Sequence, residues 1–503
     1  MRSRTLVGLP AAVSLRDAVC AEPVFGAKLA TIMPKANIET AMPGGRNRGG
    51  RDTFIHIVYY ALLYNTLRFT DRYDRTFPTL FQPRRRQAEK IIRELLVIIA
   101  VAVLSAGAAG TGSAAENAAG VRLPSDEGPT VTAIRSMRPG TWLNLGSPAP
   151  DPKWGKGRGR AWTSKMAFSA AMGGAFLFGE GIHGWANPGN GRYMDGLWLY
   201  DVNAHRWVAL YPGTDTRSPP DLQVTRDGFE GTGPDRPLPI ATMVHGYEMT
   251  AWDPVRQIFF SMPNHHAYFR KALPSVAKFR DENSSRLNRT LASPWMFDPW
   301  NRKWHRLRTA TPSPKSGYGD VLMFVPSQQK LFFYRSRQAH YYDPKNNRWQ
   351  RVNARGPLPP FGIDPTACHD PKRDRIYIGG GNYPVAKGPN GLWIFDVGAG
   401  RWIDPKPEGS PAGNHYGTNV AVMTCDPRTD RVYLFRHAGN GRGLYIYDAR
   451  KNAWRERAVP LPRFWRETTG ANGFYHPGLG VHFMHTANDS RDNGRIIVYR
   501  PEP

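Results

Sequence analysis

Short apolar runs alternate with polar turns from about residue 140 to the end of the chain. In five places an aromatic residue and an Asp close one apolar run, and a Trp six positions after the Asp opens the next. The pairs are Asp201 and Trp207, Asp298 and Trp304, Asp343 and Trp349, Asp396 and Trp402, and Asp448 and Trp454. Two extended runs joined by a short polar turn predict a β-hairpin, so the chain repeats one hairpin five times.

A second hairpin is predicted upstream of the repeated Asp residues. Its turn reads Asp-Pro in three copies, at Asp253, Asp370 and Asp426, and β-branched and aromatic residues flank it, as in Ile376–Ile378. Two hairpins together make a four-stranded antiparallel unit. The repeated Asp residues recur at intervals of 97, 45, 53 and 52 residues. An interval of about 50 residues is typical of one blade of a β-propeller.

These spacings predict an all-β, six-bladed propeller. The 97-residue interval contains a single upstream hairpin, so we interpret it as one blade with insertions at 214–238 and 264–291. The chain ends on a strand around Tyr499 that has no following Trp strand. The segment around Trp142, ahead of the first complete blade, is its expected partner. That pairing closes the ring and removes exposed sheet edges.

The repeated aromatic-Asp-x5-Trp signature resembles the kelch repeat and, more broadly, the galactose-oxidase-like propellers, over roughly residues 140–503. The double glycine usual in the second kelch strand is clear at Gly379–Gly381, whereas Phe178–Glu180 and Phe435–His437 replace it in other blades. The repeated Trp residues are expected to pack between blades, and the repeated Asp residues to accept hydrogen bonds within turns.

The chain contains three cysteines, too few for a disulfide framework. Cys368 and Cys425 occupy equivalent strands but are offset by one residue relative to the following Asp-Pro. A one-residue offset places two side chains on opposite faces of a strand. We therefore expect unpaired packing residues. Because both precede turns on the face opposite the predicted pocket, the Tyr–Cys crosslink that a resemblance to galactose oxidase implies is not expected here.

A basic stretch at Arg84–Arg86 precedes the uncharged apolar run Leu95–Ala109, and small residues follow as far as Ala115. This order is typical of a secretory signal peptide, and the run is shorter than the ~20 residues of a transmembrane helix. An uncleaved anchor is the alternative. The preceding residues are interpreted as an unstructured extension or as sequence upstream of a translation start near residue 80. The predicted segments are the extension 1–83, the signal peptide or anchor 84–115, and the propeller 140–503.

The chain carries a formal net charge of +26. For an exported protein, whether periplasmic, secreted or attached to the cell surface, this charge favours anionic partners such as acidic polysaccharides, lipid headgroups or cell-wall polymers. Solvated turn residues are the alternative explanation. The basic residues are scattered and no nucleic-acid-binding motif occurs, so a nucleic-acid partner is not expected. We expect a monomer that meets a membrane only through an uncleaved N-terminal segment.

Two sets of connections share one face of such a propeller: those leading into the first strand of each blade, and those joining its second and third strands. We call this the loop face. Seven of the 14 histidines fall on these connections. The predicted ligand-binding residues are His183, His245, Tyr247, His265, His266, Tyr318, Arg335, Asp364, His415, Tyr416, His437, Glu467 and His485.

Three interpretations of the loop face compete: a polar ligand pocket, a copper or zinc site, and histidines that only satisfy backbone carbonyls. No Cys/His cluster has metal-ligand spacing, so neither a metal nor another cofactor is expected. The predicted function is a binding or interaction module for a polysaccharide, a cell-surface polymer or a protein.

The alternative is a propeller enzyme acting on sugars, either a galactose-oxidase-like metal oxidase or an isomerase similar to the kelch sialic-acid epimerase. A Glu and an Arg near the channel would serve the acid–base chemistry of such an isomerase. Glu180, Glu467, Arg466 and Arg335 are candidates. The sequence singles out no pair among them, so no catalytic residue is assigned.

Overall fold

The computed structural model divides into two units, residues 1–110 and 111–503. It describes residues 115–116 and 122–503 with gaps at 161, 180–185, 188–190, 242–244, 264–267, 289–292, 316, 318, 336, 360–364, 380–390, 410, 412–420, 437–442, 458–470 and 487–493. The predicted extension 1–83 and, apart from Ala115, the predicted signal segment 84–115 therefore lie outside the described residues.

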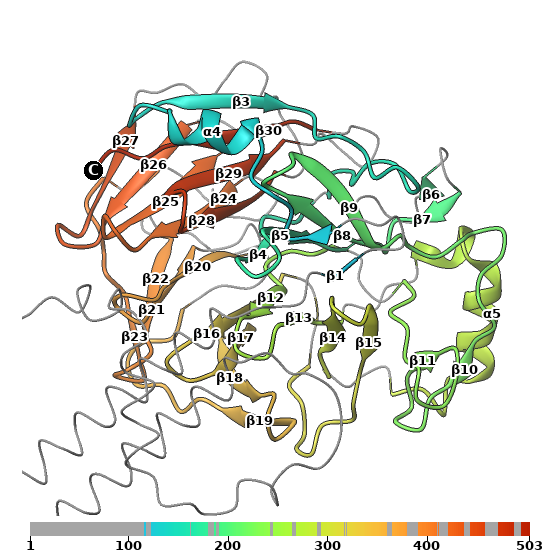
Figure 1. Ribbon diagram of the computed structural model, residues 1–503. Coiled ribbons are helices and arrows are strands. Elements are labelled where there is room, and N and C mark those ends of the chain that lie inside the picture. Colours follow the sequence, from blue (N-terminus) through green and yellow to red (C-terminus); the bar gives the residue numbers. More distant parts are fainter. Residues whose placement is uncertain are drawn as a thin grey trace, which may run out of the picture. The chain divides into compact units, whose positions relative to one another are not determined.

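The described residues form six four-stranded antiparallel blades arranged as a β-propeller (Figure 1), which confirms the predicted fold class. Blade I consists of β4 (Ala167–Ser169), β5 (Gly174–Leu177), β8 (Leu197–Asp201) and β9 (Arg206–Tyr211). Blade II consists of β12 (Thr250–Asp253), β13 (Ile258–Ser261), β14 (Trp295–Asp298) and β15 (Lys303–His305). Blade III consists of β16 (Val321–Val325), β17 (Lys330–Arg335), β18 (Gln338–Asp343) and β19 (Arg348–Arg351).

The remaining three blades complete the ring. Blade IV consists of β20 (Thr366–Asp370), β21 (Arg375–Gly379), β22 (Leu392–Asp396) and β23 (Arg401–Ile403). Blade V consists of β24 (Ala421–Asp426), β25 (Arg431–Arg436), β26 (Gly443–Asp448) and β27 (Ala453–Arg457). Blade VI consists of β28 (Asn472–His476), β29 (Val481–His485), β30 (Ile496–Tyr499) and β3 (Trp142–Gly146).

The first strands of the blades lie innermost. Each of these strands contacts the first strand of the next blade, and β28 contacts β4, so they enclose a common axis. The fourth strand of blade VI comes from the segment that precedes blade I in the sequence. This strand, β3, pairs with β30, and Trp142 lies opposite Tyr499. The predicted ring closure is therefore confirmed. It leaves every blade with four paired strands.

The repeated Trp residues are buried, with at most 5% of the surface of any of the five exposed. Trp402 of blade IV packs against Tyr334 of blade III with ring centroids 5.2 Å apart. Trp304 of blade II meets Phe178 of blade I at 5.5 Å. In the closing blade, Trp142 packs on Phe435 of blade V at 5.9 Å. The signature tryptophans thus join neighbouring blades, and Trp142 supplies the contact in blade VI.

Hydrogen bonding in the turn explains the fixed spacing between Asp and Trp. Asp343 Oδ1 accepts the backbone N–H groups of Lys345, at 3.0 Å, and Asn346, at 3.3 Å. The next residue, Asn347, has a left-handed backbone with φ of 45°. The Asp side chain fixes the turn, and the left-handed residue reverses the chain direction. The fourth strand therefore begins a fixed number of residues after the Asp.

The long interval between Asp201 and Asp298 contains one blade with insertions, as predicted. The first insertion includes β10 (Gln223–Val224) and β11 (Glu230–Gly231), and the second includes η2 (Tyr268–Lys271) and α5 (Pro274–Glu282). Figure 1 shows α5 beside β10 and β11, and the buried ion pair between Arg280 Nε and Glu230 Oε1, 2.9 Å long, links the two insertions.

Three small elements precede β4 or interrupt blade I. These are the hairpin of β1 (Ala115–Glu116) with β2 (Arg122–Leu123), the helix α4 (Pro129–Arg135), and the hairpin of β6 (Ala186–Asn187) with β7 (Arg192–Tyr193). Helix α4 buries Val131 and Ile134 against residues of blades I and VI. None of the helices among the described residues has the length and apolar character needed to cross a membrane.

The prediction that Cys368 and Cys425 are unpaired was wrong. They form a disulfide between β20 and β24, the innermost strands of blades IV and V, with Cα atoms 5.8 Å apart. The two faces of each blade pack against its two different neighbours. One face of blade IV lies against the opposite face of blade V. Side chains that lie on opposite faces of equivalent strands in these two blades therefore point toward each other. The one-residue offset gives Cys368 and Cys425 this arrangement.

Candidate functional site at the channel mouth

Four of the thirteen predicted site residues are described: His245, Tyr247, Arg335 and His485. The other nine lie outside the described residues: His183, His265, His266, Tyr318, Asp364, His415, Tyr416, His437 and Glu467.

His485 lies inside the protein. It ends β29, where it pairs with Asn472 and Ile496, and it has no exposed surface. Its imidazole packs against Trp207 of blade I with ring centroids 5.1 Å apart. His485 therefore occupies the blade-to-blade aromatic contact next to the ring closure.

His245 and Tyr247 lie in the connection that leads into blade II, and the structure brings them together with the equivalent connection of blade I. Their rings are 5.5 Å apart, and the His245 ring is 4.9 Å from Trp162. The Tyr247 backbone N–H donates to the Trp162 carbonyl at 3.0 Å, and the Ser164 N–H donates to the Tyr247 carbonyl at 3.3 Å. Two successive connections are thus paired like parallel strands.

The backbone is strained at this pairing. Trp162 has φ of 49° and Tyr247 has φ of 42°, both in the left-handed region. Bulky residues rarely adopt this conformation, which costs about 1–3 kcal/mol at each position. Such strain is concentrated in functional sites and switch regions.

A buried ion pair lies directly beyond these connections. The Lys165 ammonium is 3.7 Å from Glu248 Oε2, and the side chains are 18% and 1% exposed respectively. Ser164 Oγ donates a hydrogen bond to the other carboxylate oxygen, Oε1. Lys165 Nζ also donates to the Leu322 carbonyl at 2.5 Å.

Glu248 and Lys165 lie at the axis of the ring. Ser164 and Lys165 precede blade I, Glu248 precedes blade II, and Leu322 belongs to blade III. The Glu248 carboxylate also accepts a hydrogen bond from the backbone of Ala367 in blade IV. Side chains that contact the inner strands of four blades reach across the central channel.

Burial governs the protonation of this pair. It raises the pKa of Glu248 from 4.5 to about 7, although Lys165 and Ser164 both act to lower it. The same burial lowers the pKa of Lys165, against the attraction of the Glu248 carboxylate. A carboxyl group that titrates near neutral pH next to an amine is able to accept or donate a proton.

A second charged pair lies at the start of blade III. The Arg335 guanidinium, at the end of β17, has its Nε 3.7 Å from Asp320 Oδ1, and Asp320 is buried whereas 30% of the Arg335 side chain is exposed. The Gly317 backbone N–H donates to Asp320 Oδ2 at 2.8 Å. Arg335 thus presents a positively charged group at the loop face.

Blade VI contributes an amide. The side chain of Asn472 donates to the carbonyls of Thr163 and, at 3.3 Å, Arg160, which ties blade VI to the connection before blade I. Asn472 is fully buried, and its side-chain oxygen has no hydrogen-bond partner within the described part of the chain. We call the residues Ser164, Lys165, Glu248, Asp320, Arg335 and Asn472 the channel-mouth cluster.

The sequence contains a signal for this cluster that no single loop reveals. Lys165, Glu248 and Asp320 each stand one or two residues before the first strand of a blade, ahead of an apolar run. A charge close to the start of the first strand in three repeats is more informative than histidines scattered over loops of different length. Where the structure describes the chain, no three or more His, Cys, Asp or Glu side chains are grouped as a metal site would require.

No protein-family model and no curated protein sequence matches the chain. Among solved structures, the chain resembles a chain of the "Crystal Structure of Mitotic Checkpoint Complex", with a TM-score of 0.37 and 9% identity over 73% of this chain and 95% of that one. It also resembles the GH74 xyloglucanase from Xanthomonas campestris, with a TM-score of 0.37 and 16% identity over 69% of this chain and 44% of the xyloglucanase. The chain therefore spans less than half of that enzyme. Similarity at this level carries no functional argument.

Proposed function

We propose that this chain is an exported propeller of the kelch or galactose-oxidase-like type, whose loop face binds a polysaccharide or another cell-surface polymer. The channel-mouth cluster is the observation that carries the proposal. Donors and acceptors from several blades converge on one end of the channel, where Arg335 and Lys165 supply cations and Glu248 and Asp320 supply carboxylates. Convergent polar groups of this kind bind sugar hydroxyls and carboxylates.

The disulfide supports export. Disulfides persist in oxidising compartments and are rare in the cytosol of most organisms. Cys368 and Cys425 form such a bond within the propeller. A basic stretch and a short apolar run, as in a signal peptide, precede the propeller in the sequence.

The net charge of +26 supports an anionic polymer rather than a neutral one. The repeated aromatic-Asp-x5-Trp signature, with its tryptophans packed between blades, supports the kelch type. A protein partner at the same face is the competing outcome, and a test of glycan binding separates the two.

Binding of the purified full-length chain to an array of acidic and neutral glycans tests this function. Arg335→Gln removes the more exposed of the two cations of the cluster, and we expect at least a tenfold loss of affinity for acidic glycans, which corresponds to about 1.4 kcal/mol. Lys330→Gln is the matched control, because Lys330 begins the same strand β17 at its opposite end. Thermal unfolding of both variants verifies that they fold. The proposal fails if no glycan binds, or if both variants bind equally well.

One observation favours an enzyme that acts on sugars as the second candidate. Glu248 has a pKa of about 7 and lies beside Lys165, and general acid–base catalysts have pKa values near the operating pH. An isomerase would exchange a carbon-bound proton of its sugar with solvent. Nuclear magnetic resonance of candidate sugars incubated with the protein in D2O would detect that exchange. Loss of exchange with retained binding in Glu248→Gln would replace the binding-module proposal by this one.

A further inference from the structure

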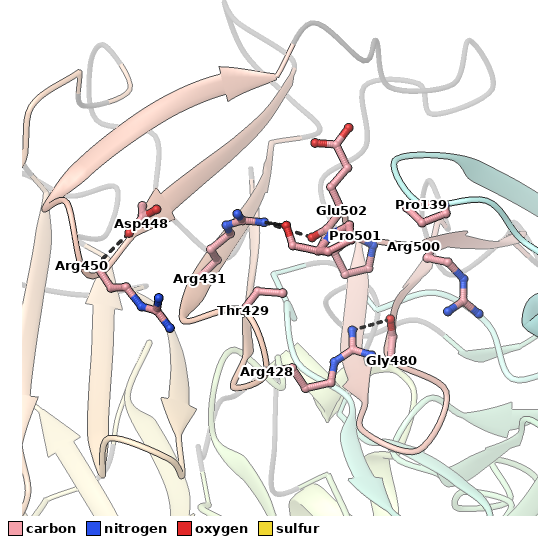
Figure 2. A pocket seen from close by; sticks show the side chains of 11 residues that line it. Pro139, Arg428, Thr429, Arg431, Asp448, Arg450, Gly480, Arg500, Pro501 and Glu502 are labelled. Carbon is pink, nitrogen blue, oxygen red and sulfur yellow. Dashed lines mark hydrogen bonds between the residues drawn. The ribbon is translucent and has the colours of Figure 1, made fainter.

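A basic pocket of about 530 Å³ (Figure 2) is lined by residues at the ends of the strands opposite to the channel-mouth cluster. It is formed by the turns of blades V and VI together with the residues that follow β30. Two acidic residues, Asp448 and Glu502, line it beside four arginines. We call Arg428, Arg431, Arg450 and Arg500 the arginine pocket.

Neighbouring groups hold each guanidinium of the arginine pocket in place. Arg428 binds both carboxylate oxygens of Asp426, at 3.0 and 2.9 Å, and donates to the Gly480 carbonyl at 2.9 Å. Arg431 donates to the Glu502 carbonyl at 3.0 Å and to the Pro503 oxygen at 3.1 Å, and Figure 2 shows its side chain directed at Glu502. Because the guanidinium groups are ordered in advance, a ligand loses little entropy in ordering them.

The other two arginines are also anchored, each by one main contact. Arg450 Nε donates to Asp430 at 2.7 Å, and Arg500 donates to the Ile134 carbonyl at 2.7 Å. Arg450 keeps most of its side chain exposed, at 69%. Arg500 has a buried Nε that finds no hydrogen-bond partner among the residues that the structure describes.

The side chains in and next to the pocket include more basic than acidic groups: Arg428, Arg431, Arg450, Arg500, Lys372, Arg373 and Arg457 against Asp426, Asp430, Asp448 and Glu502. Asp430, the partner of Arg450, also pairs with Lys372 at 3.1 Å and Arg373 at 2.7 Å. The Glu502 carboxylate is held by Arg457.

Arg500 adds to this excess of positive charge. Its partner, the Ile134 carbonyl, carries no net charge. Burial, and then the positive charge of Arg428, lowers the pKa of Arg500. A bound anion would stabilise the charged form of Arg500 against both its burial and the positive charge of Arg428.

We propose that the arginine pocket binds a tetrahedral oxyanion, a phosphate or sulfate group. Guanidinium groups match such anions through charge-assisted and often bidentate hydrogen bonds. The site is independent of the proposed glycan site, because it lies at the opposite ends of the strands.

Titration of the full-length chain with inorganic phosphate and with inorganic sulfate tests the proposal. Calorimetry at constant ionic strength, with chloride as the reference anion, separates specific binding from screening. We expect Arg450→Gln and Arg500→Gln each to weaken phosphate binding roughly tenfold to a hundredfold, as the loss of one charge-assisted hydrogen bond predicts. Arg428 is left intact, because its removal would leave the buried Asp426 without its ion-pair partner.

Lys345→Gln is the matched control. Lys345 occupies in blade III the turn position that Arg450 occupies in blade V, since their backbone N–H groups donate to Asp343 and Asp448 at 3.0 and 2.9 Å. This control and Arg335→Gln should bind phosphate like the unmodified chain.

Vesicles containing phosphatidic acid identify the source of the anion. Vesicle binding that Arg450→Gln abolishes would support the site and assign it to a lipid headgroup, whereas phosphate binding without vesicle binding would support a soluble ligand. Equal affinity for phosphate and chloride, or unchanged phosphate affinity in both arginine variants, would overturn the proposal.

Discussion

Cys368 and Cys425 bond the innermost strands of blades IV and V across 57 residues of sequence. Closing a loop of this length restricts the unfolded chain, and the chain-entropy relation gives about 4 kcal/mol of stabilisation. We therefore expect a reducing agent to lower the free energy of unfolding by up to that amount, measured by urea denaturation. The double variant Cys368→Ser/Cys425→Ser should have the lower stability already and should not respond to the reductant. Equal stability of the oxidised and reduced protein would contradict this prediction.

The ring closure can be tested with two equivalent tryptophans. Trp142 packs on Tyr499 at 4.7 Å and on Phe435 at 5.9 Å, and its strand completes blade VI. Trp142→Ala should cost about 3–5 kcal/mol, as for other large aromatic residues. Hydrogen exchange should increase in β30 in particular, because its outer partner β3 loses the packing that holds it in place. Trp454→Ala, which leaves the closure intact, should cost a similar amount without this local increase.

One of the buried histidines of blade VI, His482, predicts acid sensitivity. His482 has no exposed surface, and burial lowers its pKa from 6.5 to about 3. Between these values the unfolded chain binds more protons than the folded protein, so stability is full above pH 6.5 and is lost as the pH falls toward 3. We expect a loss of about 2 kcal/mol between pH 7 and pH 5 from this group.

Chemical denaturation across this pH range measures the effect. His482→Gln should flatten the slope, since the amide does not titrate. Part of the slope should persist, because burial also lowers the pKa of His476 to about 4. An identical slope in the variant would show that another group governs acid sensitivity.

The architecture was predictable because every blade repeats the same signals. The Asp that holds the turn and the Trp that packs on the preceding blade recur at fixed spacing, so the number of blades, the blade with insertions and the partner of the strand around Tyr499 all followed from the sequence. The pairing of Cys368 with Cys425 did not follow. A strand pattern gives the face of its own blade on which a side chain lies. The disulfide also depends on which face of blade V packs against blade IV, and the strand pattern does not give that.

The candidate site was predicted less well than the fold. His245 and Tyr247 lie on a connection into a blade, but the charged pair at the axis joins residues 165 and 248, which are distant in sequence. Such proximity arises when six first strands converge on an axis, and no local pattern reports it. His485 shows the opposite problem: the same residue type at a loop boundary serves packing against Trp207.

The axial ion pair gives a prediction whose sign depends on pH. Lys165→Met leaves the Glu248 carboxyl buried without its cation, and breaking such a pair typically costs about 3–5 kcal/mol. The pKa of Glu248 is already raised above 4.5 and should rise further without Lys165, so the folded variant binds more protons than the unfolded chain and loses stability as the pH rises. Urea denaturation should therefore show a larger loss at pH 8 than at pH 5. The double variant Lys165→Met/Glu248→Gln should recover stability at pH 8, because no buried charge remains. The prediction would be contradicted by an equal loss of unfolding free energy at both pH values together with no recovery in the double variant. That result would mean that Glu248 and Lys165 do not form an ion pair in the folded protein.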